Sequence, residues 1–299
     1  MELANIDWSQ TDHLGAVKNQ GYCGSCWAFS STSVLESLVS IKATEATGSL
    51  VSPIRLSEQQ GIDCSMRQPY GNFGCDGGNQ YLYWWFTWDN GAMSSLDYPY
   101  SAHHYGGCKQ TTESTVAARA GTIVDVDKTS VAGIHSELQN GPLSVTVNGS
   151  STGWHFYSGG VIEAGTSICT SSWSSLDHAV TLVGYDSGIE TITTTTTTPA
   201  TSTQTCTRAS RTESKAKRCY GSGEIYDRDN KECCVMAETE GSTTTKTETV
   251  RVRPASWKIM NSWGADWGEN GFIRLEAVDG GEGVCGLNQY ILGVLPYFD

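Results

Sequence analysis

Eleven cysteines in 299 residues constrain this chain more than any other feature of its sequence. So many cysteines indicate either metal sites or disulfide bonds formed in an oxidising compartment, and paired Cys-x-x-Cys knuckles are lacking. Ten of the cysteines can form five bridges, which leaves Cys26 over. An odd cysteine among disulfides is either a chance occurrence or a reactive thiol, and the count leaves both interpretations open.

The first two cysteines stand in the stretch Gln-Gly-Tyr-Cys-Gly-Ser-Cys-Trp-Ala-Phe-Ser, as Cys23 and Cys26. This spacing admits half of a metal site, a redox-active pair, or a structural cysteine beside a nucleophile. A metal site would need more ligands, and His13 is the one candidate in this region. A redox pair would need a thioredoxin-like strand and helix around it. The third interpretation is therefore favoured.

Apolar residues spaced three and four apart follow Cys26, which predicts a buried helix near residues 26–41 with Ser25 as its N-cap. Cys26 then lies in the first turn of this helix. A thiol at that position feels the positive end of the helix dipole, which favours the thiolate.

The sequence around Cys26 resembles the active-site segment of papain-like cysteine peptidases, the family of papain and the cathepsins. Further segments resemble the same family in the same order, at residues 56–64, 74–78, 177–185 and 261–271. The resemblance covers residues 7–186 and 256–297, which is nearly everything but one insertion.

The resemblance implies an α+β fold of two lobes with the active site in the cleft between them. The helical left lobe would hold about residues 13–118 and the C-terminal segment 286–299. The right lobe, an antiparallel barrel-like sheet, would hold about residues 119–285 and the N-terminal segment 1–12. We expect further helices near residues 57–63, 79–90 and 131–139, and strands near residues 121–127, 143–148, 178–186, 256–262 and 271–278. Ser57 and Gln60 form a predicted capping box.

The resemblance also implies a role for each catalytic residue, with no metal and no cofactor. Cys26 would attack the scissile carbonyl as thiolate, and His178 would pair with it and protonate the leaving amine. Asn261 would orient His178, and Trp263 would shield that hydrogen bond from water. The Gln20 side chain and the Cys26 backbone N–H would form the oxyanion hole.

Asp177, next to the histidine, is expected to support the site. The resemblance places the substrate-binding residues at Gly77, Gly78, Gln80, Thr146, Leu176, Ala179 and Tyr290. Tyr290 would form an aromatic floor of the pocket for the second residue before the cut bond, with a hydroxyl that needs a partner. This floor predicts a preference for apolar side chains at that substrate position.

The resemblance predicts three disulfides, Cys23–Cys75, Cys64–Cys108 and Cys169–Cys285. Four more cysteines lie in residues 187–255, a stretch far longer than the family needs between two strands. Its threonine-rich flanks predict flexible linkers. We expect two bridges among Cys206, Cys219, Cys233 and Cys234 to staple this insertion.

The expected function is that of a secreted or lysosomal (vacuolar) cysteine endopeptidase, acting as a monomer on proteins or peptides at acidic pH. An inhibitory pro-segment, not present in this chain, is an implied partner. The net charge of −13 argues against nucleic acid or an anionic membrane surface as a partner. Two alternatives stay open. One is a binding protein that acts through the insertion, and the other is a transpeptidase or ligase on the same fold.

Overall fold

The computed structural model describes residues 3–104, 107–208, 224–227 and 232–297, with side chains described outside 206–238. By its internal contacts the chain divides into two compact units. The first unit consists of Met1–Ile189 and Arg251–Asp299, and the second of Glu190–Val250. The second unit thus lies within the predicted insertion at residues 187–255.

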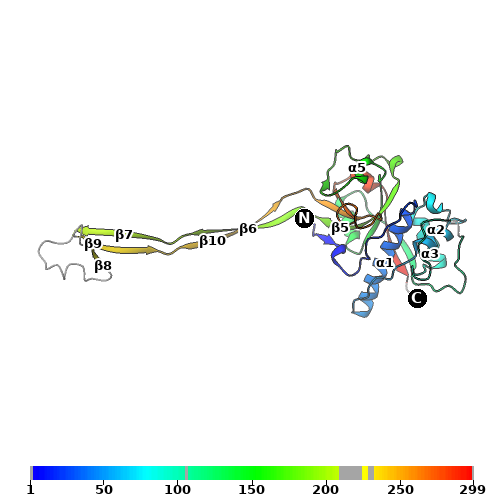
Figure 1. Ribbon diagram of the computed structural model, residues 1–299, viewed down its shortest axis with the longest axis horizontal. Coiled ribbons are helices and arrows are strands. Elements are labelled where there is room, and N and C mark those ends of the chain that lie inside the picture. The colour runs from blue at the N-terminus through cyan, green and yellow to red at the C-terminus, as the bar shows by residue number, and fades with distance from the viewer. Residues whose placement is uncertain (1–2, 105–106, 209–223, 228–231, 298–299) are drawn as a thin grey trace. The chain divides into compact units, whose positions relative to one another are not determined.

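Three helices form the helical part of the first unit (Figure 1), namely α1 (Cys26–Thr47), α2 (Glu58–Cys64) and α3 (Gln80–Asn90). Side chains on all sides of the first four turns of α1 are buried, as in a helix at the centre of a core. The helix runs beyond its predicted end because residues 42–47, which lack an apolar period, are still compatible with a helix. Gly48 ends it in the left-handed conformation, at φ 67°.

Two predicted helix caps differ in detail from the structure. Ser25 stands at the N-cap position of α1, but its side chain makes no capping hydrogen bond. Its hydroxyl lies 3.0 Å from the hydroxyl of Tyr100 instead. Ser57 does cap α2 by accepting from the Gln60 N–H at 2.9 Å. The Gln60 side chain does not complete the box, because it donates to the carbonyl of Gly91 and accepts from the N–H of Met93.

An eight-stranded sheet forms the other part of the first unit, with the strand order β2-β13-β3-β5-β11-β12-β4 and with β1 paired to β5. Only β12 and β4 pair in parallel; the other pairs are antiparallel. The strands are β1 (Ile6–Asp7), β2 (Arg119–Asp125), β3 (Leu143–Val147), β4 (Val161–Ile162), β5 (His178–Asp186), β11 (Ser256–Met260), β12 (Phe272–Glu276) and β13 (Ile291–Tyr297). Two helices, α4 (Val131–Leu138) and α5 (Thr152–His155), accompany the sheet.

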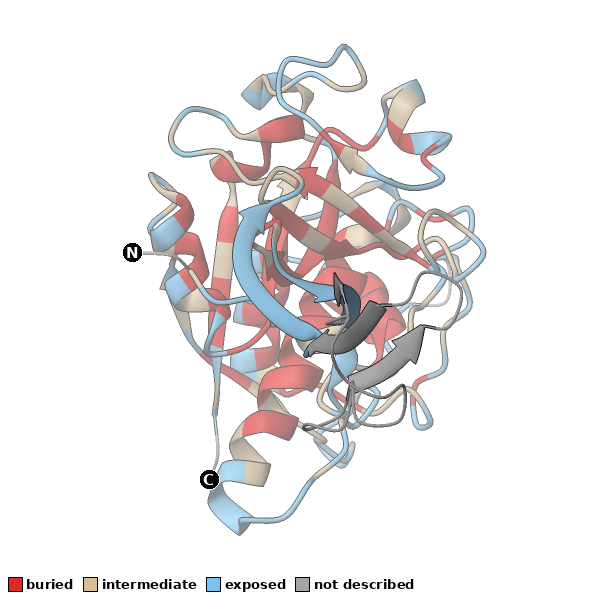
Figure 2. Cartoon of the chain, turned by 90° about the vertical axis from the view of Figure 1, so that its left-hand side faces the viewer, coloured by how far each residue is buried: buried red, intermediate tan, exposed pale blue. Residues whose placement is uncertain are grey.

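The helices and the sheet share a core. Val34 and Leu35 of α1 and Trp84 of α3 pack in one buried cluster with Ala120 of β2 and Val294 of β13. The C-terminal segment, expected to cross to the helical lobe, therefore contacts α1 while it also pairs within the sheet. In Figure 2 the buried residues lie on the sheet and on the helices next to it.

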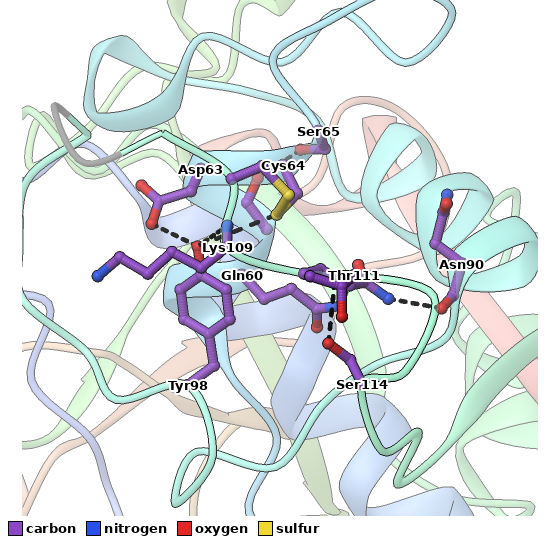
Figure 3. The surroundings of a disulfide bond; sticks show 12 residues. Gln60, Asp63, Cys64, Ser65, Asn90, Tyr98, Lys109, Thr111 and Ser114 are labelled. Carbon is purple, nitrogen blue, oxygen red and sulfur yellow. Dashed lines mark hydrogen bonds between the residues drawn. A yellow bond between two sulfur atoms is a disulfide. The ribbon is translucent and has the colours of Figure 1, made fainter.

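The structure contains the disulfides Cys23–Cys75, Cys64–Cys108 and Cys169–Cys285, and Cys26 is the free cysteine among the residues whose side chains are described. Figure 3 shows the surroundings of Cys64 at the end of α2. There the hydroxyl of Tyr98 donates to Asp63 at 2.8 Å and accepts from the Lys109 N–H at 3.2 Å. The disulfide Cys64–Cys108 thus ties α2 to the loop that follows α3.

The described residues of the second unit form two small sheets. The strands β6 (Ile189–Thr198) and β10 (Ser242–Arg251) pair with each other. The strands β7 (Thr201–Arg208), β9 (Glu232–Thr239) and β8 (Glu224–Asp227) form a three-stranded sheet in that order. The threonine-rich flanks, expected to be linkers, form paired strands, because threonine is β-branched and favours extended backbone. The expected bridges among the four cysteines of this unit fall outside the residues whose side chains are described.

Within the described ranges, no helix has the length and apolar character needed to cross a membrane. The same ranges contain no group of three or more His, Cys, Asp or Glu side chains placed to hold a metal ion.

Candidate active site

Cys26 is the first residue of α1, so its thiol lies at the positive end of a helix of 22 residues. Cys23, three residues earlier, is bonded to Cys75 in a disulfide. The bond leaves no partner for a redox pair. The structure thus agrees with the third interpretation of this spacing in that it contains a disulfide-bonded cysteine beside a free one.

His178 begins β5, and Asn261 follows the neighbouring strand β11 directly. Because β5 and β11 pair side by side, the two residues meet although they are 83 positions apart. His178 Nε2 lies 2.8 Å from Asn261 Oδ1, and a carbonyl oxygen can only accept, so the ring nitrogen donates. The Ser262 N–H donates to the same oxygen at 2.8 Å. These contacts fix the ring and direct its other nitrogen toward Cys26.

The Cys26 thiol and the His178 ring interact and shift each other's pKa in opposite directions. Burial raises the pKa of Cys26, but the bond and charge of His178, with the N–H groups of Ala179 and Trp27, outweigh it and the pKa is lowered. Burial lowers the pKa of His178, but Cys26, Asn261 and Asp177 outweigh it and the pKa is raised. Both shifts favour a thiolate–imidazolium pair.

Aromatic rings enclose the histidine on the side of Asn261. The ring of Trp263 lies 5.0 Å from that of His178 between centroids, at 32°. Trp154 of α5, fully buried, meets the same ring edge-on at 6.3 Å. Trp267 stacks on Trp154 at 6.1 Å. An apolar enclosure strengthens the His178–Asn261 hydrogen bond because it keeps competing water away.

Asp177 holds the loop that packs on the histidine. Its Oδ1 accepts from the N–H groups of Gly149 at 2.8 Å and Ser150 at 3.3 Å. A Cβ at position 149 would come within 2.5 Å of the His178 Cβ. A glycine is therefore required here by close approach and not by its backbone angles.

Gln20 reaches the site from the loop before α1 and is held at both ends of its side-chain amide. Its Nε2 donates to the Cys23 carbonyl at 2.8 Å, and its Oε1 accepts from the Ser262 hydroxyl at 2.6 Å. One of the two N–H groups of the amide is thereby used. The other can serve a substrate oxygen.

A pocket of about 250 Å³ adjoins Cys26 and His178. Of the predicted substrate-binding residues, Gly78, Gln80, Thr146, Leu176, Ala179 and Tyr290 line it. Gly77 is not part of the lining. Three further lining residues, Trp27, Asn79 and Trp173, were not predicted.

Two hydrogen bonds join the helical and sheet parts at this pocket. Tyr290 donates its hydroxyl to Asn79 Oδ1 at 2.9 Å, which supplies the partner expected for the aromatic floor. Gln80 Nε2 donates to the Thr146 hydroxyl at 3.0 Å. The polar groups of the walls are thus paired with one another. The remaining lining, with Leu176 and Ala179, suits an apolar side chain.

Sequence reasoning missed Asn79, Ser262 and Trp154 as parts of the site. Asn79 could have been found as the N-cap of a helix beginning after the glycine pair, since its side chain accepts from the N–H of Tyr81. Ser262 lies inside the recognised motif. Trp154 carries no local signal, because its contact with His178 exists only once α5 packs against the sheet.

Three comparisons bear on this geometry. The family model described as papain family cysteine protease matches residues 3–196 and 244–295. Procathepsin L of Mus musculus is 31% identical over 272 residues, covering 91% of this chain and 59% of the relative. The KDEL-tailed cysteine endopeptidase CEP2 of Arabidopsis thaliana is 29% identical over 286 residues, covering 95% and 57%. The chain thus spans less than three fifths of the length of these relatives.

Among solved structures, bromelain from Ananas comosus in complex with the E64 inhibitor matches with a TM-score of 0.64 at 26% sequence identity. The match covers 97% of each chain. The gap in the family match, residues 197–243, falls within the second unit of this chain.

Proposed function

Because the chain belongs to the papain family of cysteine proteases, we propose that it is an endopeptidase that cleaves peptide bonds through Cys26, His178 and Asn261. One observation carries the proposal. The free thiol at the start of α1 adjoins the same pocket as a histidine whose Nε2 is held by an asparagine oxygen at 2.8 Å, and this histidine lowers the pKa of the thiol. This is the arrangement of an activated nucleophile, a base and an orienting group.

In the proposed reaction the Cys26 thiolate attacks the carbonyl carbon of the scissile bond. The Gln20 amide N–H and the Cys26 backbone N–H stabilise the negative charge that forms on the oxygen. His178, as imidazolium, gives its proton to the leaving amine, which leaves a thioester on Cys26. His178 then takes a proton from water, the hydroxide attacks the thioester, and the acid product leaves with the thiolate restored.

The pH range of activity follows from the two pKa directions. The ion pair exists above the pKa of Cys26, which is lowered, and below that of His178, which is raised. We therefore propose activity that extends to mildly acidic pH, where an ordinary thiol is almost fully protonated.

We further propose that the enzyme prefers an apolar side chain at the second residue before the cut bond. The pocket lined by Tyr290, Leu176 and Ala179 supports this preference. A basic side chain there would lose water without a dedicated carboxylate, since Asp177 already accepts two backbone N–H groups.

Protein or peptide substrates and an inhibitory pro-segment outside this chain are the proposed partners, and a secreted, lysosomal or vacuolar compartment is the proposed location. The support is the three disulfides, which form in oxidising compartments, and the similarity of the chain to a procathepsin and to a KDEL-tailed cysteine endopeptidase.

The test is iodoacetamide labelling of the folded, unreduced protein at pH 5.5, with the modified peptide identified by mass. A thiol of ordinary pKa would be about 0.1% thiolate there and nearly inert. We expect rapid labelling at Cys26, with loss of cleavage of a fluorogenic peptide in parallel, and no labelling after His178→Ala. Slow labelling at Cys26, or labelling that leaves peptide cleavage intact, would exclude it as the nucleophile.

A ligase or transpeptidase would pass through the same thioester. Product analysis in the presence of an added amine separates the two, because hydrolysis gives the free acid and transfer gives an amide. We expect the free acid to predominate.

A further inference from the structure

Three large aromatic side chains are exposed along one face of α3. Tyr81, Trp85 and Trp88 are 46%, 38% and 50% exposed. At 100° per residue, positions 81, 85 and 88 fall within about 60° of arc, so the three side chains form one stripe. Scattered surface aromatics are ordinary, but an aligned set on one helix face indicates a surface that binds something.

The stripe begins at the edge of the substrate pocket. Asn79, which lines that pocket, caps α3, and its Oδ1 accepts both from the Tyr81 N–H at 2.8 Å and from the Tyr290 hydroxyl at 2.9 Å. The helix then leads away from the pocket. Tyr81 and Trp88 are separated by about 10 Å along the axis, the length of about three residues of extended chain.

The middle of the stripe is held in place. The ring of Tyr70 meets that of Trp85 edge-on at 5.5 Å. The Tyr70 hydroxyl donates to Asp89 Oδ2 at 2.9 Å and accepts from Asn90 Nδ2 at 2.7 Å. A surface fixed in this way loses little conformational entropy on binding.

We propose that the stripe is an exosite for the substrate chain itself, which binds the apolar residues that precede the pocket-bound residue of a long polypeptide. This inference rests on the proposed function. The substrate chain is the expected ligand because the stripe is continuous with the pocket. A polypeptide bound in the pocket can reach Trp85 and Trp88 with its next few residues. The enzyme would then favour extended or unfolded protein substrates with an aromatic or aliphatic segment upstream of the cut.

The test compares three quenched fluorescent peptides with the same residues around the cut bond. One has no upstream extension, one has four apolar residues upstream of the pocket position, and one has four Gly and Ser residues there. For the unsubstituted protein we expect kcat/KM to be roughly tenfold higher with the apolar extension than with the Gly and Ser extension. In the variant Trp85→Gln/Trp88→Gln this ratio should fall to about one, while cleavage of the short peptide changes less than about twofold.

The matched control is Leu50→Gln, which removes another exposed apolar side chain, 53% exposed, beyond the end of α1 remote from Cys26. The Leu50→Gln variant should keep the roughly tenfold ratio of kcat/KM between the apolar extension and the Gly and Ser extension. Thermal melting of each variant excludes unfolding as the cause of a change. A ratio near one in the unsubstituted protein, or equal losses on the short and extended peptides in the double variant, would overturn the exosite while the proposed function stands. No cleavage of any peptide by the unsubstituted protein would refute the proposed function, and the exosite with it.

Discussion

Substitution of Lys18 by methionine should test how the loop before Cys26 is anchored. The Lys18 ammonium lies 2.6 Å from a carboxylate oxygen of Glu36 and 2.6 Å from one of Glu58. All three side chains are nearly buried, at 10%, 1% and 5% exposed. The backbone of Lys18 is tied to the segment that follows Asn261, because its carbonyl accepts from the Gly264 N–H at 3.0 Å. One cation therefore neutralises two carboxylates within the core.

The size of the effect follows from this imbalance. Removing one partner of a buried ion pair costs about 3–5 kcal/mol, because a charge is left without compensation in a medium of low dielectric constant. Here Lys18→Met leaves two carboxylates facing each other, so we expect a loss of unfolding free energy at the upper end of that range.

The matched control is Lys42→Met. Lys42 makes an ion pair of similar length with Glu45, at 2.7 Å, but those side chains are 38% and 59% exposed. Exposed pairs contribute about 0–1 kcal/mol.

The penalty should also depend on pH. Burial already raises the pKa of Glu36, with Lys18 opposing it, so removal of Lys18 raises this pKa further. A carboxyl group whose pKa is raised by folding takes up a proton more readily in the folded state. Its destabilising effect is absent below the unfolded pKa, near 4.3, and grows as the pH rises through the folded pKa. The penalty of Lys18→Met should therefore be larger at pH 7 than at pH 4.

The assay is urea unfolding of both variants at pH 4 and pH 7, followed by tryptophan fluorescence, with Cys26 alkylated to prevent self-digestion. The reasoning would be refuted by equal losses for Lys18→Met and Lys42→Met at pH 7. It would also be refuted if the Lys18→Met penalty were as large at pH 4 as at pH 7.

Three further predictions concern the site. Asn261→Ala removes the acceptor that orients His178. It should lower kcat about 100-fold, measured with a fluorogenic peptide, and change the melting temperature little, measured by calorimetry. An unchanged kcat would contradict the orienting role. Gly149→Ala brings a Cβ within 2.5 Å of the His178 Cβ and should destabilise the protein by about 1–3 kcal/mol and lower kcat. The same substitution at Gly293, where a Cβ would meet its nearest atoms at 3.4 Å and 3.5 Å, should affect kcat less. Asp177→Asn removes a negative charge that raises the pKa of His178. In a plot of kcat/KM against pH, the alkaline limb should therefore move to lower pH, while the acid limb, set by Cys26, moves less. A shift of the alkaline limb to higher pH would contradict this role of Asp177.

The sequence by itself determined the local parts of this protein. The start of α1 at Cys26 follows from apolar periodicity. The resemblance to the papain family predicted the bounds of α2, α3 and α4 to within one or two residues, and also the strands around His178 and Asn261. The same resemblance predicted the three disulfide pairs that the structure contains. These features depend on neighbours along the chain or on a recognised pattern, and both can be seen in the amino-acid sequence.

Tertiary structure decided which partner each polar side chain takes. Ser25 stands at an N-cap position, yet its hydroxyl lies beside Tyr100, and the Gln60 side chain leaves its predicted box for Gly91 and Met93. A short-range hydrogen bond and a long-range one have similar net free energies, near 1 kcal/mol, so packing decides between them. The aromatic contact of Trp154 with His178 and the stripe on α3 also exist only in the folded chain. Sequence fixes which groups are available, and the packing of helices against the sheet fixes which of them meet.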